Sequence, residues 1–147
     1  MTSPNSGTGY DKSDREKGGN GYMPISLQYN DYTATYARNP SLAGGDPFEN
    51  FTNRSYKGKS VKTANKQDML SVLETKAKME GKPVIVSLEM DKPTIMSEFE
   101  GSADAILVNF GVQNQAVLDI ISGKAEPSAL LPLQMPAGSD GGKETPG

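Results

Sequence analysis

The stretch of residues 81–93, GKPVIVSLEMDKP, constrains the fold of this chain more than any other. Its centre, residues 84–88, is nearly all apolar and rich in β-branched side chains, and a Lys-Pro pair lies on each side of it. This pattern predicts a short strand that is buried on both faces, as strands inside parallel sheets are. Such a strand needs a neighbour at each edge, which other segments of the chain have to supply.

The segments around this strand alternate between helical and strand patterns. Asn65 is placed to cap a helix over residues 66–80, which Gly81 ends. We expect this helix to bury an apolar stripe formed by Met69, Leu70, Leu73, Ala77 and Met79. After the central strand we expect a short helical turn, a second buried strand, a helix and a last short strand, over residues 94–99, 103–110, 114–121 and 130–135. The second helix is expected to turn inward Val117, Leu118 and Ile121.

This order of elements predicts an α/β fold, a three-layer sandwich with a mostly parallel sheet and right-handed crossovers. Hydrophobic residues make up only 35% of the chain, so the core is concentrated in one region. Two strands are clear, whereas a sheet of this kind has about five or six. We therefore expect the sheet to be incomplete, with an open edge through which two copies form a homodimer at high concentration.

The N-terminal region differs from the rest of the chain in composition. Residues 1–22 predict a loop, and residues 22–36 predict an edge strand or an ordered loop because Pro24 cannot donate to a sheet. Residues 37–60 predict a further loop. The expected organisation is therefore a loop-rich segment, an α/β core and a flexible tail, over residues 1–64, 65–136 and 137–147.

Composition and charge exclude several classes of function. The chain has no Cys and no His, so it offers no thiol nucleophile, no imidazole base and no zinc site of the usual kind. We expect no metal and no cofactor. A net charge of −3 argues against nucleic acid as a partner, and no apolar run approaches the roughly 20 residues that span a membrane. The first residues also lack the apolar region of a signal peptide, which leaves the compartment undetermined.

Ordered motifs from residue 81 onward resemble those of a known family. They are a Gly-Lys-Pro turn, an Ala-Asp-Ala-Ile-Leu strand, a helix bounded by glycines and a Pro-Ser-x-x-Leu-Pro ending, at residues 81–83, 103–107, 111–123 and 127–132. Over about residues 66–136 the chain resembles the C-terminal α/β-sandwich domain of family 3 glycoside hydrolases, the β-glucosidase and β-xylosidase group. Ala129 replaces a family glycine, and residues 109–115 depart from the usual motif, which indicates a divergent branch.

The resemblance implies a larger, bacterial parent enzyme that cleaves β-glycosides from their non-reducing ends with retention. In the family, further βα units and a (β/α)8-barrel domain precede this domain, and the barrel carries the Asp nucleophile. The resemblance therefore implies that this chain is the C-terminal piece of such an enzyme and is inactive alone. Its implied partners are a β-linked oligosaccharide and the N-terminal barrel domain, in a periplasmic or secreted parent.

The resemblance also indicates where a catalytic acid would lie. In the family, the second carboxyl group is often a Glu on a loop of this domain, and the candidate here is residues 6–20, SGTGYDKSDREKGGN. In one alignment, residues 9–12 match the G-[YF]-D-R sequence of the family loop, which makes Tyr10 and Asp11 the candidate substrate-binding residues. That alignment puts Thr8 or Ser6 where the Glu is expected, so the acid is absent.

A second alignment matches residues 16–20 to another form of the family loop. It makes Glu16 the proton donor, with Asp14 as a nearby substitute. A general acid at neutral pH needs burial to raise its pKa, which the barrel domain would supply. The same residues also fit a solvated loop of mixed charge.

Two other functions remain open from the sequence. The chain fits a non-catalytic carbohydrate-binding or assembly module that keeps the fold without the acid. An unrelated flavodoxin-like binding domain is less favoured, because residues 111–114 contain one glycine and no G-x-G-x-x-G motif.

Overall fold

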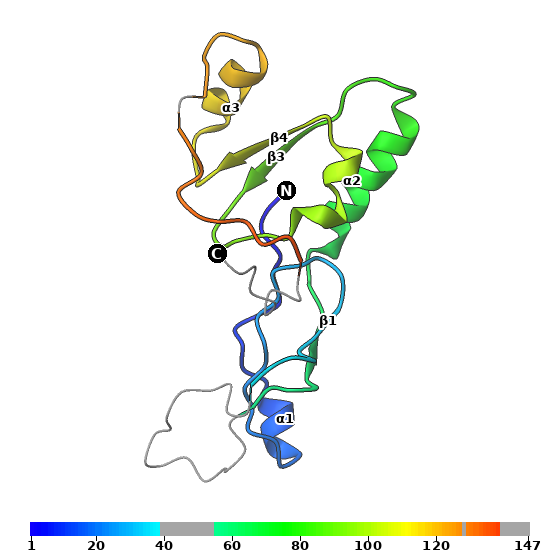
Figure 1. Cartoon of the computed structure of the whole chain (residues 1–147), viewed down its shortest axis with the longest axis vertical. Coiled ribbons are helices and arrows are strands. Elements are labelled where there is room, and N and C mark those ends of the chain that lie inside the picture. The colour runs from blue at the N-terminus through cyan, green and yellow to red at the C-terminus, as the bar shows by residue number, and fades with distance from the viewer. Residues whose placement is uncertain (39–54, 128, 139–147) are drawn as a thin grey trace, which may run out of the picture.

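Strand β3 (Ile85–Glu89) forms where the sequence predicts it and pairs in parallel with β4 (Ala105–Asn109), in a register from Ile85↔Ala105 to Glu89↔Asn109. The structure is a computed structural model that describes residues 1–38, 55–127 and 129–138. Helix α2 (Lys66–Lys78) precedes β3, and helix α3 (Asn114–Ile121) follows β4 (Figure 1). The prediction of an α/β fold with parallel strands is confirmed.

The first residues of the chain pair with the other edge of β3. A parallel bridge joins Thr2 to Glu89. The Met1 amino group donates a hydrogen bond to the Ser87 carbonyl at 2.9 Å, and the Glu89 N–H donates to the Met1 carbonyl at 3.0 Å. Strand β3 is therefore the middle of three parallel segments, although the sequence predicted a loop over residues 1–22.

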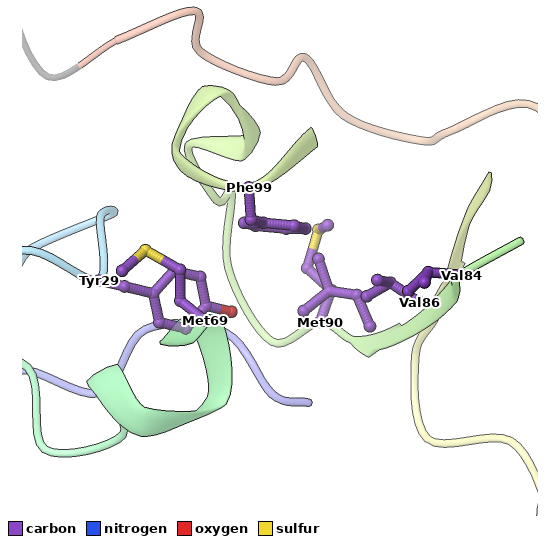
Figure 2. Packing of buried hydrophobic residues seen from close by; sticks show 7 residues of the cluster. Tyr29, Met69, Val84, Val86, Met90 and Phe99 are labelled. Atoms are coloured by element: carbon purple, nitrogen blue, oxygen red, sulfur yellow. The ribbon is translucent and has the colours of Figure 1, made fainter. Parts of the chain in front are cut away.

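The core lies on one face of β3, and its side chains come from several segments (Figure 2). Its buried members are Tyr29, Met69, Val84, Val86, Leu88, Met90 and Phe99. The rings of Tyr29 and Phe99 meet edge to face, with centroids 5.8 Å apart and planes at 77°. Because Tyr29 is fully buried, the N-terminal region contributes directly to the core of the α/β unit.

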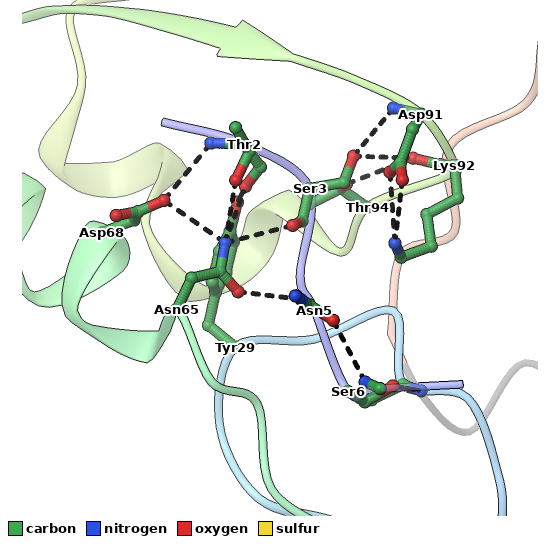
Figure 3. Close-up of polar contacts among 12 residues, drawn as sticks. Thr2, Ser3, Asn5, Ser6, Tyr29, Asn65, Asp68, Asp91, Lys92 and Thr94 are labelled. Carbon is green, nitrogen blue, oxygen red and sulfur yellow. Dashed lines mark hydrogen bonds and ion pairs between the residues drawn. The ribbon is translucent and has the colours of Figure 1, made fainter. Parts of the chain in front are cut away.

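A polar network at the start of α2 ties the N-terminal segment to the core (Figure 3). Asn65 occupies the N-cap position of α2, but its side chain makes no capping hydrogen bond. Its amide nitrogen donates to the Ser3 carbonyl at 3.1 Å, and its side-chain oxygen accepts from the Asn5 N–H at 2.8 Å. The Tyr29 hydroxyl donates to the Thr2 carbonyl at 2.6 Å. Asn65 therefore stands at the predicted position, but the expected capping hydrogen bond is absent because its side-chain amide binds the N-terminal segment instead.

The outward face of the sheet is not buried as the sequence predicted. Ile85 of β3 is 44% exposed on this face. In α3, Val117, Leu118 and Ile121 turn toward this face as predicted, but Leu118 and Ile121 are not buried there and remain 56% and 44% exposed. They line a groove of about 520 Å³ together with Ser87 and Glu89 of β3. The described sheet consists of only three short segments. Its outer face is therefore too small to bury the apolar side chains of α3.

Two smaller expectations also fail. Ala77 is exposed on α2, whereas Val72 packs against the core. Residues 130–135 form an irregular segment instead of a last strand, and Leu130 is 94% exposed. Pro132 lies inside this segment and has no N–H to donate to a ladder.

The part of the N-terminal region around α1 and β1 extends away from the sheet, toward the lower end of the view in Figure 1. It contains helix α1 (Lys12–Glu16) and a small antiparallel pair, β1 (Tyr32–Thr33) with β2 (Ser60–Val61). The sequence analysis did not predict α1 or β2. Parts of the predicted loop over residues 37–60 and of the predicted tail over residues 137–147 lie outside the described residues.

The connection from β3 to β4 contains two 3-10 turns, η1 (Met96–Glu98) and η2 (Glu100–Ser102). The first of them confirms the helical turn predicted over residues 94–99. Within the residues that the structure describes, no helix is long and apolar enough to cross a membrane.

We expect the Leu88→Ala substitution to lower the free energy of unfolding by about 2–5 kcal/mol, because it leaves a cavity in a closely packed core. Leu88 is fully buried, whereas Leu130 is 94% exposed. Leu130→Ala is therefore the matched control and should change stability by less than about 0.5 kcal/mol. Urea unfolding followed by circular dichroism measures both variants, and equal effects would contradict the assignment of the core.

The open sheet edge predicts self-association. In the described part of the chain, no strand pairs with the outer edge of β4, and an unpaired edge invites pairing with a second copy. We expect light scattering to report a dimer at millimolar concentration. A monomer mass that stays constant from micromolar to millimolar concentration would contradict this.

Candidate functional site

The candidate site is a hairpin-like loop over residues 9–23, called the α1 loop from here on, with α1 at its tip. An antiparallel bridge joins Tyr10 to Tyr22 at its base. The Asp11 N–H donates to the Gly21 carbonyl at 2.7 Å, on the same pair of strands. Figure 1 places α1 at the opposite end of the molecule from α3. The loop therefore projects from the α/β unit.

Asp11 starts helix α1. Its side chain accepts a hydrogen bond from the Ser13 N–H at 2.8 Å, which is the usual role of an N-cap residue. The hydrogen bonds from Ser13 hold the pKa of Asp11 below its usual range. Asp11 is therefore ionised at neutral pH. An Asp followed by a further acid in the first turn is a recognised helix start, so the sequence contained a signal for α1.

Asp14 lies on the inner side of α1, facing the rest of the loop. It accepts hydrogen bonds from the Lys59 ammonium at 2.7 Å and from the Gly21 N–H at 2.8 Å. The hydrogen bond from Lys59 is the main reason that the pKa of Asp14 lies below its usual range. This environment stabilises the carboxylate over the protonated acid that a proton donor requires.

Glu16 lies at the C-terminal end of α1 and faces solvent. Its side chain is 66% exposed and sits 3.9 Å from the Lys12 ammonium, which is itself 85% exposed. Such a surface pair contributes little to stability. The Glu16 carboxylate is therefore accessible to a neighbouring domain or to a ligand.

Tyr10 presents an aromatic ring at the base of the loop. The ring is half-exposed and meets Tyr22 edge to face, with centroids 5.7 Å apart and planes at 86°. Gly21 lies directly against it with a φ of +80°, and a Cβ at Gly21 would come within 2.6 Å of the Tyr10 ring. A glycine is therefore required at residue 21 for both its backbone conformation and its contact with the ring.

The four predicted residues, Tyr10, Asp11, Asp14 and Glu16, all lie in the α1 loop because they are close in sequence, but Asp14 faces Lys59 whereas Glu16 faces solvent. Sequence reasoning missed Lys59, which lies 45 positions from its partner Asp14. Nothing in the local sequence around Lys59 signals this contact. Among the described residues, no group of three His, Cys, Asp or Glu side chains is placed to hold a metal ion.

Two surface hollows at the sheet offer a different kind of site. The groove beside α3 is lined by one acid, Glu89, and a smaller hollow beside α2 is lined by one acid, Asp68. Retaining glycosidases pair two carboxyl groups about 5–5.5 Å apart. Neither hollow provides such a pair, so the α1 loop remains the better candidate.

Comparison with known protein families identifies the class to which this chain belongs. The sequence model described as the glycosyl hydrolase family 3 C-terminal domain matches residues 26–145. Because this match covers most of the chain, the chain belongs to that family. The resemblance stated from the sequence is thereby confirmed.

Individual relatives match over shorter regions. Beta-glucosidase C of Emericella nidulans is 33% identical over 58 residues, which are 40% of this chain and 9% of that protein. The periplasmic beta-glucosidase/beta-xylosidase of Dickeya chrysanthemi is 26% identical over 87 residues, which are 59% of this chain and 13% of that protein. The matched part of this chain thus spans only a small fraction of each relative's length. No solved structure gave a significant match.

We expect the carboxyl group of Asp14 to titrate below its ordinary value of 3.8 in the folded chain. Because the pKa is lower in the folded than in the unfolded chain, the contact with Lys59 stabilises the folded loop above that pH. This contribution is lost as the pH falls through the folded-state pKa. Carbon NMR titration of Asp14, in the folded chain and in concentrated urea, measures both values. Equal values would contradict the expectation.

Proposed function

We propose that this chain is the C-terminal part of a retaining, exo-acting β-glucosidase-like enzyme and that its α1 loop helps to line the active site. Membership of the family supports the first part of the proposal, as do relatives named beta-glucosidase and beta-glucosidase/beta-xylosidase, whereas the family match over residues 26–145 does not include the α1 loop. The observation that carries it is the projection of the α1 loop away from the α/β unit. A loop in that position can reach a neighbouring domain.

In this proposal, Glu16 is the proton donor and the barrel domain upstream supplies the nucleophile. The exposed Glu16 side chain is free to be buried against another domain, and burial favours the protonated form of a carboxyl group, which a general acid requires. Asp14 is the weaker candidate, because Lys59 stabilises its ionised form. The parent would act on a β-linked oligosaccharide.

Tyr10 and Asp11 are the proposed substrate contacts. A half-exposed tyrosine ring offers an apolar face to a sugar and a polar hydroxyl at its tip. The ionised Asp11 carboxylate can accept hydrogen bonds from sugar hydroxyls, in addition to the bond from the Ser13 N–H. Both residues belong to the base of the same loop as Glu16.

The second candidate function is a non-catalytic carbohydrate-binding or assembly module. It is favoured by Thr8 at the position of the expected Glu in one alignment. It is also favoured by the hydrogen bonds that Asp11 and Asp14 already accept within the loop and that Asp14 accepts from Lys59. In that case, the α1 loop would contact sugar or a partner domain without transferring a proton.

We expect the isolated chain not to hydrolyse an aryl β-glucoside, because in this proposal the barrel domain carries the nucleophile that forms the covalent intermediate. The measurement compares release of the aryl group by the chain with release in buffer alone. The polypeptide encoded upstream in the same reading frame should restore hydrolysis when it is joined to this chain. Hydrolysis above background by the isolated chain would contradict the proposal.

In that joined protein, Glu16→Gln should lower kcat by about 10²–10⁴-fold if Glu16 is the proton donor. Glu74→Gln is the matched control, because Glu74 is also an exposed helical glutamate, 3.6 Å from the Lys78 ammonium at i,i+4. Unchanged activity in both variants would reject Glu16 as the acid and favour the non-catalytic alternative.

A further inference from the structure

The ammonium group of Lys59 is held by three acceptors from one loop. Its nitrogen lies 2.7 Å from an Asp14 carboxylate oxygen, 2.5 Å from the Asn20 side-chain oxygen and 2.9 Å from the Tyr22 carbonyl. The Lys59 side chain is only 16% exposed. A lysine ammonium has three N–H donors, so each donor has an acceptor in this arrangement.

The backbone of Lys59 is anchored outside the α1 loop. Its carbonyl accepts a hydrogen bond from the Ala34 N–H at 3.0 Å, next to the pairing of β1 with β2. Its N–H donates to the Tyr56 carbonyl at 3.0 Å, within a turn. Val61, two residues further along β2, is buried. The long lysine side chain therefore reaches the α1 loop from a base anchored by Ala34 and Tyr56, and Asn20 of the loop also donates to the Ser55 carbonyl of this base at 3.1 Å.

The three acceptors come from both halves of the α1 loop. Asp14 belongs to α1, whereas Asn20 and Tyr22 belong to the segment that returns from it, in which Tyr22 forms the bridge to Tyr10. The two halves are also joined to each other, because the Gly21 N–H donates to the Asp14 carboxylate at 2.8 Å. Lys59 thus holds the helix and the returning strand at one point.

Apolar packing contributes little to holding α1 in place. None of the residues of α1 is buried, and its sequence, KSDRE, has no apolar side chain to turn inward. The direction in which α1 points is consequently set by polar contacts. Of these, the contact between Lys59 and Asp14 joins two charges at a partly buried position, where electrostatic interactions are stronger than at an exposed surface.

We propose that Lys59 is the positioning residue of the α1 loop, which it holds in the orientation that presents Glu16 to the neighbouring domain. This role rests on the proposed function, because it assigns Lys59 a part in the same site. An arginine is a poor substitute, because a planar guanidinium cannot direct its donors toward three acceptors gathered around one nitrogen.

The first test uses the 147-residue chain and compares Lys59→Met with Lys57→Met, an exposed lysine in the turn before β2. Native-state hydrogen exchange should show amides of residues 9–23 exchanging about ten-fold faster or more in Lys59→Met, with those of β3 and β4 unchanged. Lys57→Met should match the wild type. Unchanged protection of the α1 loop, or an equal loss in β3 and β4, would overturn the proposal.

A second variant keeps the proposal testable if Lys59→Met does not fold. Asp14→Asn removes the charge of the partner while keeping its size, and Lys59 retains its contacts with Asn20 and Tyr22. Protection of the α1 loop should fall in this variant as well, by less than in Lys59→Met. An α1 loop as protected in Asp14→Asn as in the wild type would count against the charged contact as the origin of its order.

The second test measures the positioning role in the protein joined to its upstream polypeptide. There, Lys59→Met should lower kcat by about 10–10²-fold, because the acid is misplaced, and should also raise KM, because Tyr10 and Asp11 belong to the same loop. Lys57→Met should leave both unchanged. A loosened α1 loop with unchanged kcat would reject the positioning role. An inactive joined wild type with a loosened α1 loop in Lys59→Met would instead reject the proposed function, while the contact itself would stand.

Discussion

The burial of one face of β3 is the contact on which the rest of the structure depends. Val86 and Leu88 point into the core and are 5% and 0% exposed. Side chains from α2, from the η1–η2 connection and from the N-terminal region converge on this face. Removing this apolar surface from water stabilises the fold by roughly 25 cal/mol for each Å² buried. The same strand also aligns β4 on one edge and the first residues of the chain on the other.

The molecule combines two kinds of stabilisation in different places. Around β3, apolar side chains pack from several segments, and polar contacts such as those of Asn65 hold the N-terminal segment against the packed unit. In the α1 loop, the helix buries nothing, and hydrogen bonds to Lys59 and within the loop determine its shape. A projecting loop of this kind suits a role at the border of another domain, where contacts from that domain complete its environment.

Sequence reasoning succeeded where structure depends on local patterns. The bounds predicted for α2, β3, β4 and α3 differ from the observed ones by only a few residues, because helical and strand periodicities are visible within short windows. It failed where the partner is distant. The pairing of Met1 with Ser87, the contact of Lys59 with Asp14 and the exposure of Leu118 depend on segments that the chain brings together only after folding.

The sequence by itself determined the family, the α/β class and the identity of the carboxylates and tyrosines available for chemistry, because motifs and composition are properties of the chain. Only the tertiary structure decided which carboxylates are paired with other groups of the chain and which face solvent. Asp14 meets a lysine that is remote in sequence, whereas Glu16, two residues further along the chain, faces solvent. The accessibility of each carboxylate depends on the charges and surfaces around it, and these come from segments that meet only when the chain folds.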